Sequence, residues 1–201
     1  MLTKSLYDVR RINDFRDLLE QSSSAFADKA AFLVRNKNDN SLKEVSYHRF
    51  KSDVDALGAA LNSMGLDGSF VAVTGENRYE WCVSYLAVTN HTGVVVPIDK
   101  ELPVAEKENL LQRSGAVALI FSGRYEKDML RLKNSATDVK YFIHMDLEED
   151  NENFLSYAGL LERGRKLLSE GSIDLSRHKI DPAALGILLF TSGTTDLAKV
   201  V

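Results

Sequence analysis

The chain has 201 residues, of which 44% are hydrophobic and 27% charged, values typical of one globular domain or one large subdomain. Its net charge of −4, without a strong basic block, argues against nucleic acid as a main partner. No apolar run reaches membrane-spanning length, and the N-terminus lacks the apolar core of a signal peptide. The single cysteine, Cys82, cannot form an internal disulfide, which favours a reducing, cytoplasmic location.

The N-terminal part of the chain predicts a helix, a hairpin and a longer helix. Apolar residues at near-helical spacing predict the first helix over residues 12–26. Two short strands are expected at 31–34 and 43–46, joined by a turn rich in Asn, Asp and Lys. Ser46 is expected to cap the next helix, whose apolar residues recur every three or four positions up to Met64.

The middle of the chain alternates strands and helices. Apolar runs predict buried strands at 70–73, 94–96 and 117–121, and helices are expected between them at 78–90 and 103–114. Asn77 and Glu80 have the spacing of a capping box for the first of these helices. That helix is expected to bury Trp81, Cys82, Tyr85 and Leu86. In such surroundings Cys82 is predicted to be a structural thiol rather than a nucleophile.

The C-terminal part continues the same pattern. It predicts a helix at 125–132, a strand at 141–143, a helix at 154–168, a polar connector at 172–181 and a last strand at 185–190. The acidic run 146–152 is interpreted as a solvated loop. Short apolar strands alternating with amphipathic helices predict an α/β fold, with a mainly parallel sheet and helices on both faces. In such sheets, ligands bind beyond the carboxyl ends of strands.

A cluster of hydroxyl residues around one glycine follows the last predicted strand. Its members are Thr191, Ser192, Gly193, Thr194 and Thr195, and Lys199 comes shortly after them. Hydroxyl donors, successive backbone N–H groups and a lysine can together hold a polyphosphate. The second interpretation is a Ser/Thr-rich surface turn with a solvated lysine. The four scattered histidines, His48, His91, His144 and His178, form no metal-ligand pattern, so no metal site is predicted.

Residues 191–200 resemble the phosphate-loop signature T-S-G-T-T-G-x-P-K-G of the adenylate-forming superfamily. The match covers the cluster and Lys199, and the chain departs from the signature at Asp196, Ala198 and Val200. Three earlier segments also resemble the family, and they occur in the family's order at 45–47, 75–81 and 92–99. The second of these, with Glu76-Asn77-Arg78 and Trp81, is similar to a segment of fatty acyl-CoA synthetases. The resemblance therefore covers nearly the whole chain.

This resemblance implies that residues 1–201 are the N-terminal part of an AMP-binding domain, ending just after the phosphate loop. It implies an acyl-CoA synthetase, an acid–thiol ligase of fatty acid metabolism, as the parent enzyme. That enzyme would use ATP, Mg²⁺ and coenzyme A to join a carboxylate substrate, such as a fatty acid, to the thiol. The loop residues Thr191 to Thr195 and Lys199 would contact phosphates.

The resemblance also implies what this chain leaves to later segments. Family members place the Mg²⁺-binding Glu, the ribose-binding Asp and the catalytic Lys farther along, so no catalytic or metal residue is assigned here, and the chain alone is expected to be inactive. The alternative is a stand-alone, non-catalytic binding or interaction module of the same fold, which the carboxylate of Asp196 favours. Because Val200 begins an apolar run, we also expect an open sheet edge and self-association.

Overall fold

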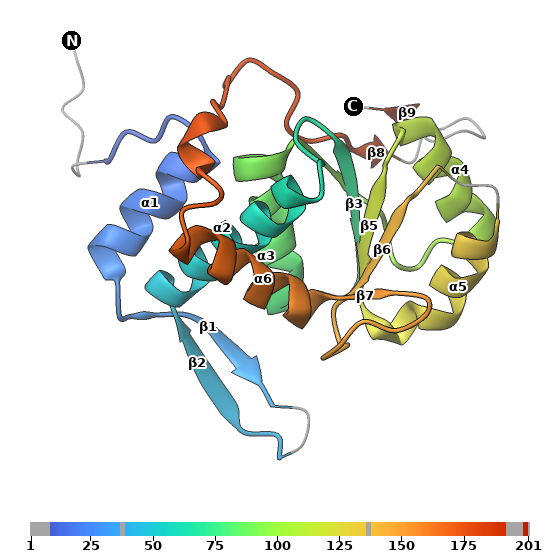
Figure 1. Ribbon diagram of the computed structural model, residues 1–201, viewed down its shortest axis with the longest axis horizontal. Coiled ribbons are helices and arrows are strands. Elements are labelled where there is room, and N and C mark those ends of the chain that lie inside the picture. The colour runs from blue at the N-terminus through green and yellow to red at the C-terminus, as the bar shows by residue number, and fades with distance from the viewer. Residues whose placement is uncertain (1–8, 37–38, 136–137, 192–198, 201) are drawn as a thin grey trace, which may run out of the picture.

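The computed structural model describes residues 9–36, 39–135, 138–191 and 199–200, and it shows an α/β body from which one hairpin projects (Figure 1). The main sheet contains five strands in the order β4 (Val94–Pro97), β3 (Phe70–Thr74), β5 (Ala118–Phe121), β6 (Tyr141–His144) and β7 (Leu155–Ser156). All neighbouring strands are parallel. The predicted fold class is confirmed. The sequence did not predict β7, because a strand of two residues has no periodicity to detect.

Helices cover both faces of this sheet, as the sequence predicts (Figure 1). Alternate strand residues point to opposite faces. One face packs its apolar side chains, Val71, Val73, Ile120 and Ile143 among them, against α2 (Tyr47–Ser63), α3 (Tyr79–Ala87) and α6 (Tyr157–Ser169). The opposite face packs Ala72, Leu119, Phe121 and Phe142 against α4 (Val104–Ser114) and α5 (Glu126–Asn134). Each buried Val, Leu, Ile or Phe contributes roughly 1.5–3 kcal/mol.

The N-terminal elements lie outside α2. Helix α1 (Phe15–Phe26) begins three residues later than predicted, because the side chain of Asp14 accepts a hydrogen bond from the N–H of Asp17 and caps the helix. The predicted hairpin is confirmed as β1 (Ala30–Arg35) paired antiparallel with β2 (Leu42–Ser46). Ser46 caps α2 as expected, since its hydroxyl accepts a hydrogen bond from the N–H of Arg49. Two short 3₁₀ turns, Gly123–Tyr125 and Leu175–Arg177, complete the connections.

The side of α3 that faces the core differs from the side that the sequence predicts. Val83, Ser84 and Ala87 are fully buried, whereas the four expected residues are half-buried. Helix α3 has more apolar residues than its core-facing side can bury. The large rings of Trp81 and Tyr85 therefore lie nearer the surface, where they stack with centroids 5.3 Å apart. Burial raises the pKa of the Cys82 thiol, which favours its unreactive protonated form. The chain then continues through a π-helical turn, Val88–Thr92.

A buried carboxylate joins three helices on this side of the sheet. Asp53 of α2 accepts hydrogen bonds from Arg49 in the same helix, from the Tyr79 hydroxyl of α3 at 2.9 Å and from Arg165 of α6 at 2.6 Å. Burial and the charge of Asp53 raise the pKa of Tyr79, so its hydroxyl stays protonated as the donor. Because three donors satisfy the carboxylate, it can be buried without a large cost. Among the described residues no helix is long and apolar enough to span a bilayer.

Helices α2 and α6 are in tight contact at Gly164. A Cβ atom added there would lie 1.8 Å from the carbonyl oxygen of Ala56, too close for any adjustment of a side chain to relieve. We expect Gly164→Ala to lower the free energy of unfolding by about 1–3 kcal/mol, because the two helices would have to move apart. Urea denaturation checks this. The control is Gly159→Ala in the same helix, where the nearest neighbouring atom is 3.5 Å away, and an equal loss in both variants would contradict the explanation.

Candidate functional site

The predicted phosphate loop lies between two short strands that pair with each other. β8 (Phe190–Thr191) and β9 (Lys199–Val200) are antiparallel, with Thr191 opposite Lys199. The hydroxyl cluster's other members, Ser192, Gly193, Thr194 and Thr195, lie outside the described residues, as does Asp196. The structure therefore brings the first and last predicted site residues together at the base of a hairpin. Thr191 is exposed there.

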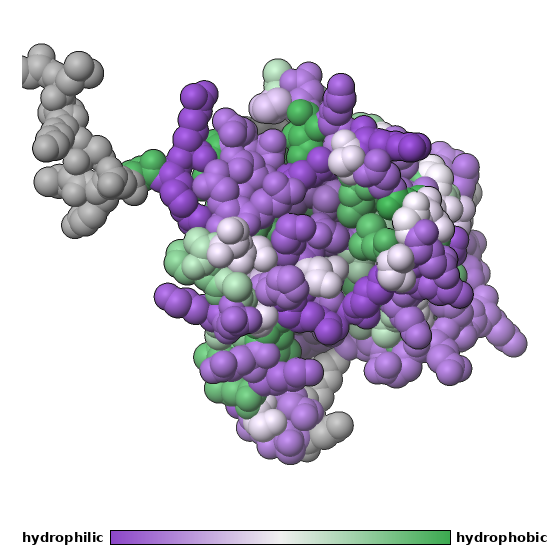
Figure 2. Space-filling view, turned by 60° about the vertical axis from the view of Figure 1, so that its left-hand side comes forward, coloured by the Kyte–Doolittle hydropathy of each residue, from purple (hydrophilic) through white to green (hydrophobic). Residues whose placement is uncertain are grey.

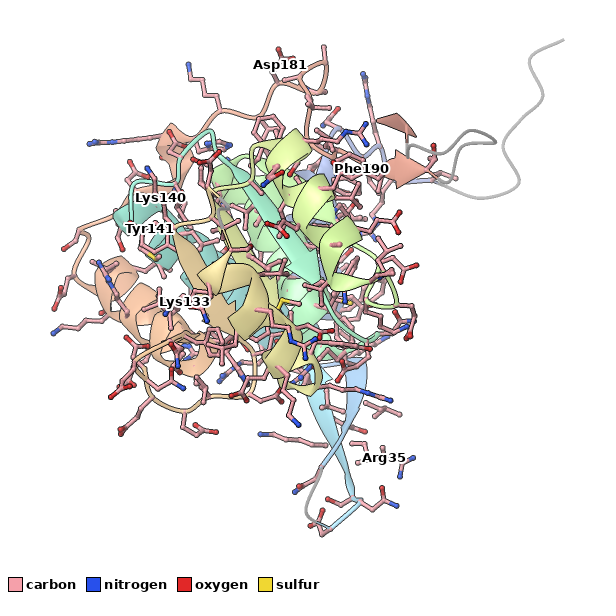
Figure 3. All side chains as sticks on the ribbon, turned by 90° about the vertical axis from the view of Figure 1, so that its right-hand side faces the viewer. Arg35, Lys133, Lys140, Tyr141, Asp181 and Phe190 are labelled. Atoms are coloured by element: carbon pink, nitrogen blue, oxygen red, sulfur yellow. The ribbon has the colours of Figure 1, made fainter. Side chains whose placement is uncertain are left out.

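The segment that leads into this hairpin is attached to the edge of the main sheet. The N–H of Val95 in β4 donates to the carbonyl of Gly186, and the N–H of Leu188 donates to the carbonyl of Val95, which gives a parallel bridge at Ile187. Leu188 is buried, and Phe190 packs against the same apolar cluster. The guanidinium of Arg113 in α4 lies 5.5 Å from the centre of the ring of Phe190, the residue labelled beside β8 in Figure 3. These contacts hold the base of the loop against the α4 face.

The predicted last strand, residues 185–190, is wrong in its length and its pairing. Only the bridge at Ile187 joins the five-stranded sheet, and β8 pairs with β9 instead. Leu185 and Leu189 are 56% and 45% exposed, so this apolar run is not buried on both faces as a central strand would be. The loop consequently leaves a separate hairpin rather than a strand of the main sheet.

The carboxyl ends of β3, β5 and β6 form a second polar site, centred on Arg78. One guanidinium nitrogen of Arg78 lies 2.9 Å from Oδ2 of Asp146, and Nε donates to Oε2 of Glu80 at 2.7 Å. The same Asp146 oxygen accepts the N–H of Gly123 at 2.8 Å. Burial alone would lower the pKa of Arg78, but Glu80 and Asp146 raise it above its ordinary value. Arg78 is therefore a permanent cation that joins the loops after β3 and β6.

This arrangement corrects two expectations from the sequence. Asp146 does not belong to a solvated loop but is partly buried in an ion pair, while Glu148 to Glu152 are exposed as predicted. The predicted capping box is wrong, because Arg78 occupies the cap position of α3 without a side-chain cap, and Glu80 binds Arg78 instead. Tight packing also fixes Gly123, since an added Cβ would lie 2.4 Å from Cε1 of His144. A Ser-Gly pair directly after an apolar strand was the available signal for this site.

The histidines have structural surroundings. His91 is buried and its Nε2 lies 2.9 Å from Asp55, and burial lowers its pKa despite that carboxylate. His144 is buried between Phe121 and Phe154, and Nδ1 of His178 lies 2.9 Å from Asp67. Within the part of the chain that the structure describes, no group of three or more His, Cys, Asp or Glu residues could hold a metal ion. The described residues thus do not provide a complete set of ligands for Mg²⁺.

Comparison with known proteins identifies the family. The sequence model of a family described as AMP-binding enzyme matches residues 19–201. The chain belongs to the AMP-binding enzyme family.

Individual relatives agree with this assignment. "Fatty acyl-CoA synthetase A" of Dictyostelium discoideum is 30% identical over 207 residues, covering 98% of this chain and 29% of the relative. "Long-chain-fatty-acid--CoA ligase 5" of Rattus norvegicus is 26% identical and covers 91% of this chain and 28% of the relative. The chain therefore spans less than a third of the length of these two curated relatives.

Solved structures of the family share the fold. The anthranilate CoA ligase AuaEII in complex with anthranoyl-AMP superimposes with a TM-score of 0.74 at 19% identity, covering 96% of this chain and 35% of that structure. The N-terminal domain of FACL13 from Mycobacterium tuberculosis gives a TM-score of 0.72 at 19% identity, covering 94% of this chain and 44% of that domain structure. The solved structures support the fold, and the curated relatives confirm the resemblance to fatty acyl-CoA synthetases that the sequence predicts.

The ion pairs of Arg78 generate a prediction about stability. Arg78→Met leaves the carboxylates of Asp146 and Glu80 partly buried without their cation, so we expect a loss of about 1–3 kcal/mol in the free energy of unfolding. Urea denaturation with unchanged slope would measure it. Arg124→Met, at an exposed arginine of the neighbouring loop, is the matched control. If both variants lose the same amount, Arg78 does not hold these loops together.

Proposed function

We propose that the chain is the N-terminal part of a longer, ATP-dependent fatty acyl-CoA ligase. One observation carries the proposal: the family match extends through the T-S-G-T-T…K segment, and the curated relatives include fatty acyl-CoA synthetases whose length exceeds this chain more than threefold. The single cysteine and the composition support a cytoplasmic location as part of the same proposal.

The proposed reaction has two steps. A carboxylate oxygen of the fatty acid attacks the α-phosphorus of ATP and pyrophosphate leaves, which gives an acyl-adenylate. The sulfur of coenzyme A then attacks the acyl carbon, loses its proton, and AMP leaves. Bound Mg²⁺ would neutralise phosphate charge in the first step.

This chain's part in the reaction is to position the triphosphate. The hydroxyls and N–H groups of residues 191–195 would hold the β- and γ-phosphates, with Lys199 adding positive charge. The described residues fit this role, because the pairing of Thr191 with Lys199 closes the loop and leaves Thr191 exposed to a ligand. Closing the loop in advance reduces the entropy that a bound ligand would otherwise have to remove.

The first test is pyrophosphate release with ATP, Mg²⁺ and a panel of fatty acids. We expect the 201-residue chain to show none above background, because the family's Mg²⁺, ribose and catalytic-lysine segments lie in later parts of its members. The reading frame beyond Val201 should encode those segments, and the longer polypeptide should release pyrophosphate. Turnover by the 201 residues alone would refute the proposal that catalysis needs the later segments. A stop codon after Val201 would favour the non-catalytic module.

A variant of Asp196 provides a second test between the ligase and the non-catalytic module. At the position where the family usually has glycine, its carboxylate would lie roughly 6 Å from phosphate, a repulsion of up to ~3 kcal/mol at an effective dielectric near 20. The conformational difference between aspartate and glycine is smaller, about 0.5–1 kcal/mol. We therefore expect Asp196→Gly in the longer protein to tighten ATP binding, measured by calorimetry, with a gain that shrinks as salt rises. Asp138→Gly, which removes a charge from an exposed loop, is the control, and equal affinities of the Asp196 variant and the parent would show that the carboxylate points away.

A further inference from the structure

The hairpin β1–β2 is a two-stranded sheet that stands apart from the main sheet. It projects from the body, and Arg35 near its tip lies far from the main sheet (Figures 1 and 3). Among the described residues, neither strand pairs with a third one. In an antiparallel pair, every second residue of each strand directs its N–H and C=O away from the partner strand. Two strands alone are marginally stable in water. A third strand added at the free edge would therefore stabilise this hairpin.

One face of the hairpin also presents apolar side chains to solvent. Leu33 is 60% exposed and Leu42 is 56% exposed. The register pairs Leu33 with Glu44 and Arg35 with Leu42, so all four side chains lie on the same face. Apolar surface is visible on the hairpin in the lower part of Figure 2. A pair of exposed leucines on a projecting strand pair is typical of a surface that another polypeptide covers.

A groove of about 1040 Å³ runs along β1. Its wall includes four consecutive residues of this strand, 32–35, and Asn36 directly after it. Because successive side chains of a strand point to opposite faces, a cavity under one face would be lined by every second residue. Contact with each of these residues in turn indicates that the groove reaches the edge of β1, the side on which β1 has no partner strand among the described residues. The shape therefore suits an extended chain laid beside β1.

The opposite wall of the groove is acidic. It contains Glu76, Glu80, Asp146 and Glu148 together with Arg78, and the β1 side of the groove adds Arg35. Arg78 already serves three of these carboxylates, at 3.8 Å from Glu76, 2.7 Å from Glu80 and 2.9 Å from Asp146. One oxygen of Glu76 is buried without a hydrogen-bond partner. Four carboxylates against two guanidinium groups leave a negative surplus, which favours a strand that carries basic side chains.

We propose that the edge of β1 binds an added β-strand, supplied by the part of the longer ligase that lies outside these 201 residues. This inference rests on the proposed function for the source of the strand. The curated relatives are more than three times as long as the chain, so the proposed protein has ample further polypeptide. Main-chain hydrogen bonds to β1 would provide affinity, apolar side chains would cover Leu33 and Leu42, and basic ones would meet the acidic wall.

Hydrogen exchange of the 201-residue chain tests the strand addition. The probe is an acetylated peptide of about six residues with alternating valine and lysine, long enough to form an ordinary strand. We expect saturable, one-to-one binding that slows amide exchange in residues 30–35. The control peptide has the same sequence with alternate backbone nitrogens methylated, so that it keeps its charge but cannot donate to β1. Equal protection by both peptides, or protection by neither, would overturn the proposal.

Paired variants test the acidic wall. Glu76→Gln combined with Glu148→Gln should weaken the lysine peptide roughly fivefold, the usual scale of two partly exposed charge pairs. The control combines Glu106→Gln with Glu162→Gln, which removes the same charge from exposed positions away from the groove. Equal weakening by both pairs would overturn the charge argument. Sedimentation without peptide completes the test, because a dimer that protects β1 and resists the peptide would assign the edge to a second copy. Loss of pyrophosphate chemistry in the longer protein would leave these binding results unchanged, so the two proposals fail separately.

Discussion

The ion pairs of Arg78 connect three loops at the carboxyl edge of the main sheet. The arginine follows β3, its carboxylate partner Asp146 follows β6, and the same carboxylate receives the N–H of Gly123 after β5. Three loops from the carboxyl edge of the sheet are thereby held in one arrangement. In parallel sheets this edge is where ligand-binding loops are displayed. Here a cation and carboxylates fill the point between β3 and β5 where the strand order reverses, so charge pairing occupies a place that other folds leave to a ligand.

The helices and most of the strands could be predicted from the sequence because their signals are local. Helix α2 shows its apolar period and its Ser46 cap directly, and β3, β4, β5 and β6 are short apolar runs between turn residues. The face of α3 could not be predicted. Its apolar residues surround the helix, so periodicity does not distinguish the inner side, and packing against α2 and the sheet selects Val83 and Ala87. Pairing between distant segments, such as Arg78 with Asp146, has no local signature either.

The candidate phosphate loop depended on resemblance rather than on physical pattern. Hydroxyl residues around a glycine are common in surface turns, and only the order of several family segments made Thr191 to Lys199 informative. The structure adds the pairing that closes the loop and the contacts of Leu188 and Phe190 that hold its base. The roles of Ser192 to Thr195 stay predictions. Family membership and relatives make the ligase the best-supported interpretation of those residues.

The attachment of the loop to β4 has a consequence for the order of assembly. The five strands of the main sheet are complete by Ser156, and α6 ends at Ser169, before residues 186–188 are added beside Val95. During synthesis the N-terminal parts of a chain emerge and fold first. The exposed side of β4 can therefore act as a finished template when the late segment leaves the ribosome. The hairpin that carries the candidate phosphate loop is then added to a sheet that is already formed, and it need not help to build that sheet.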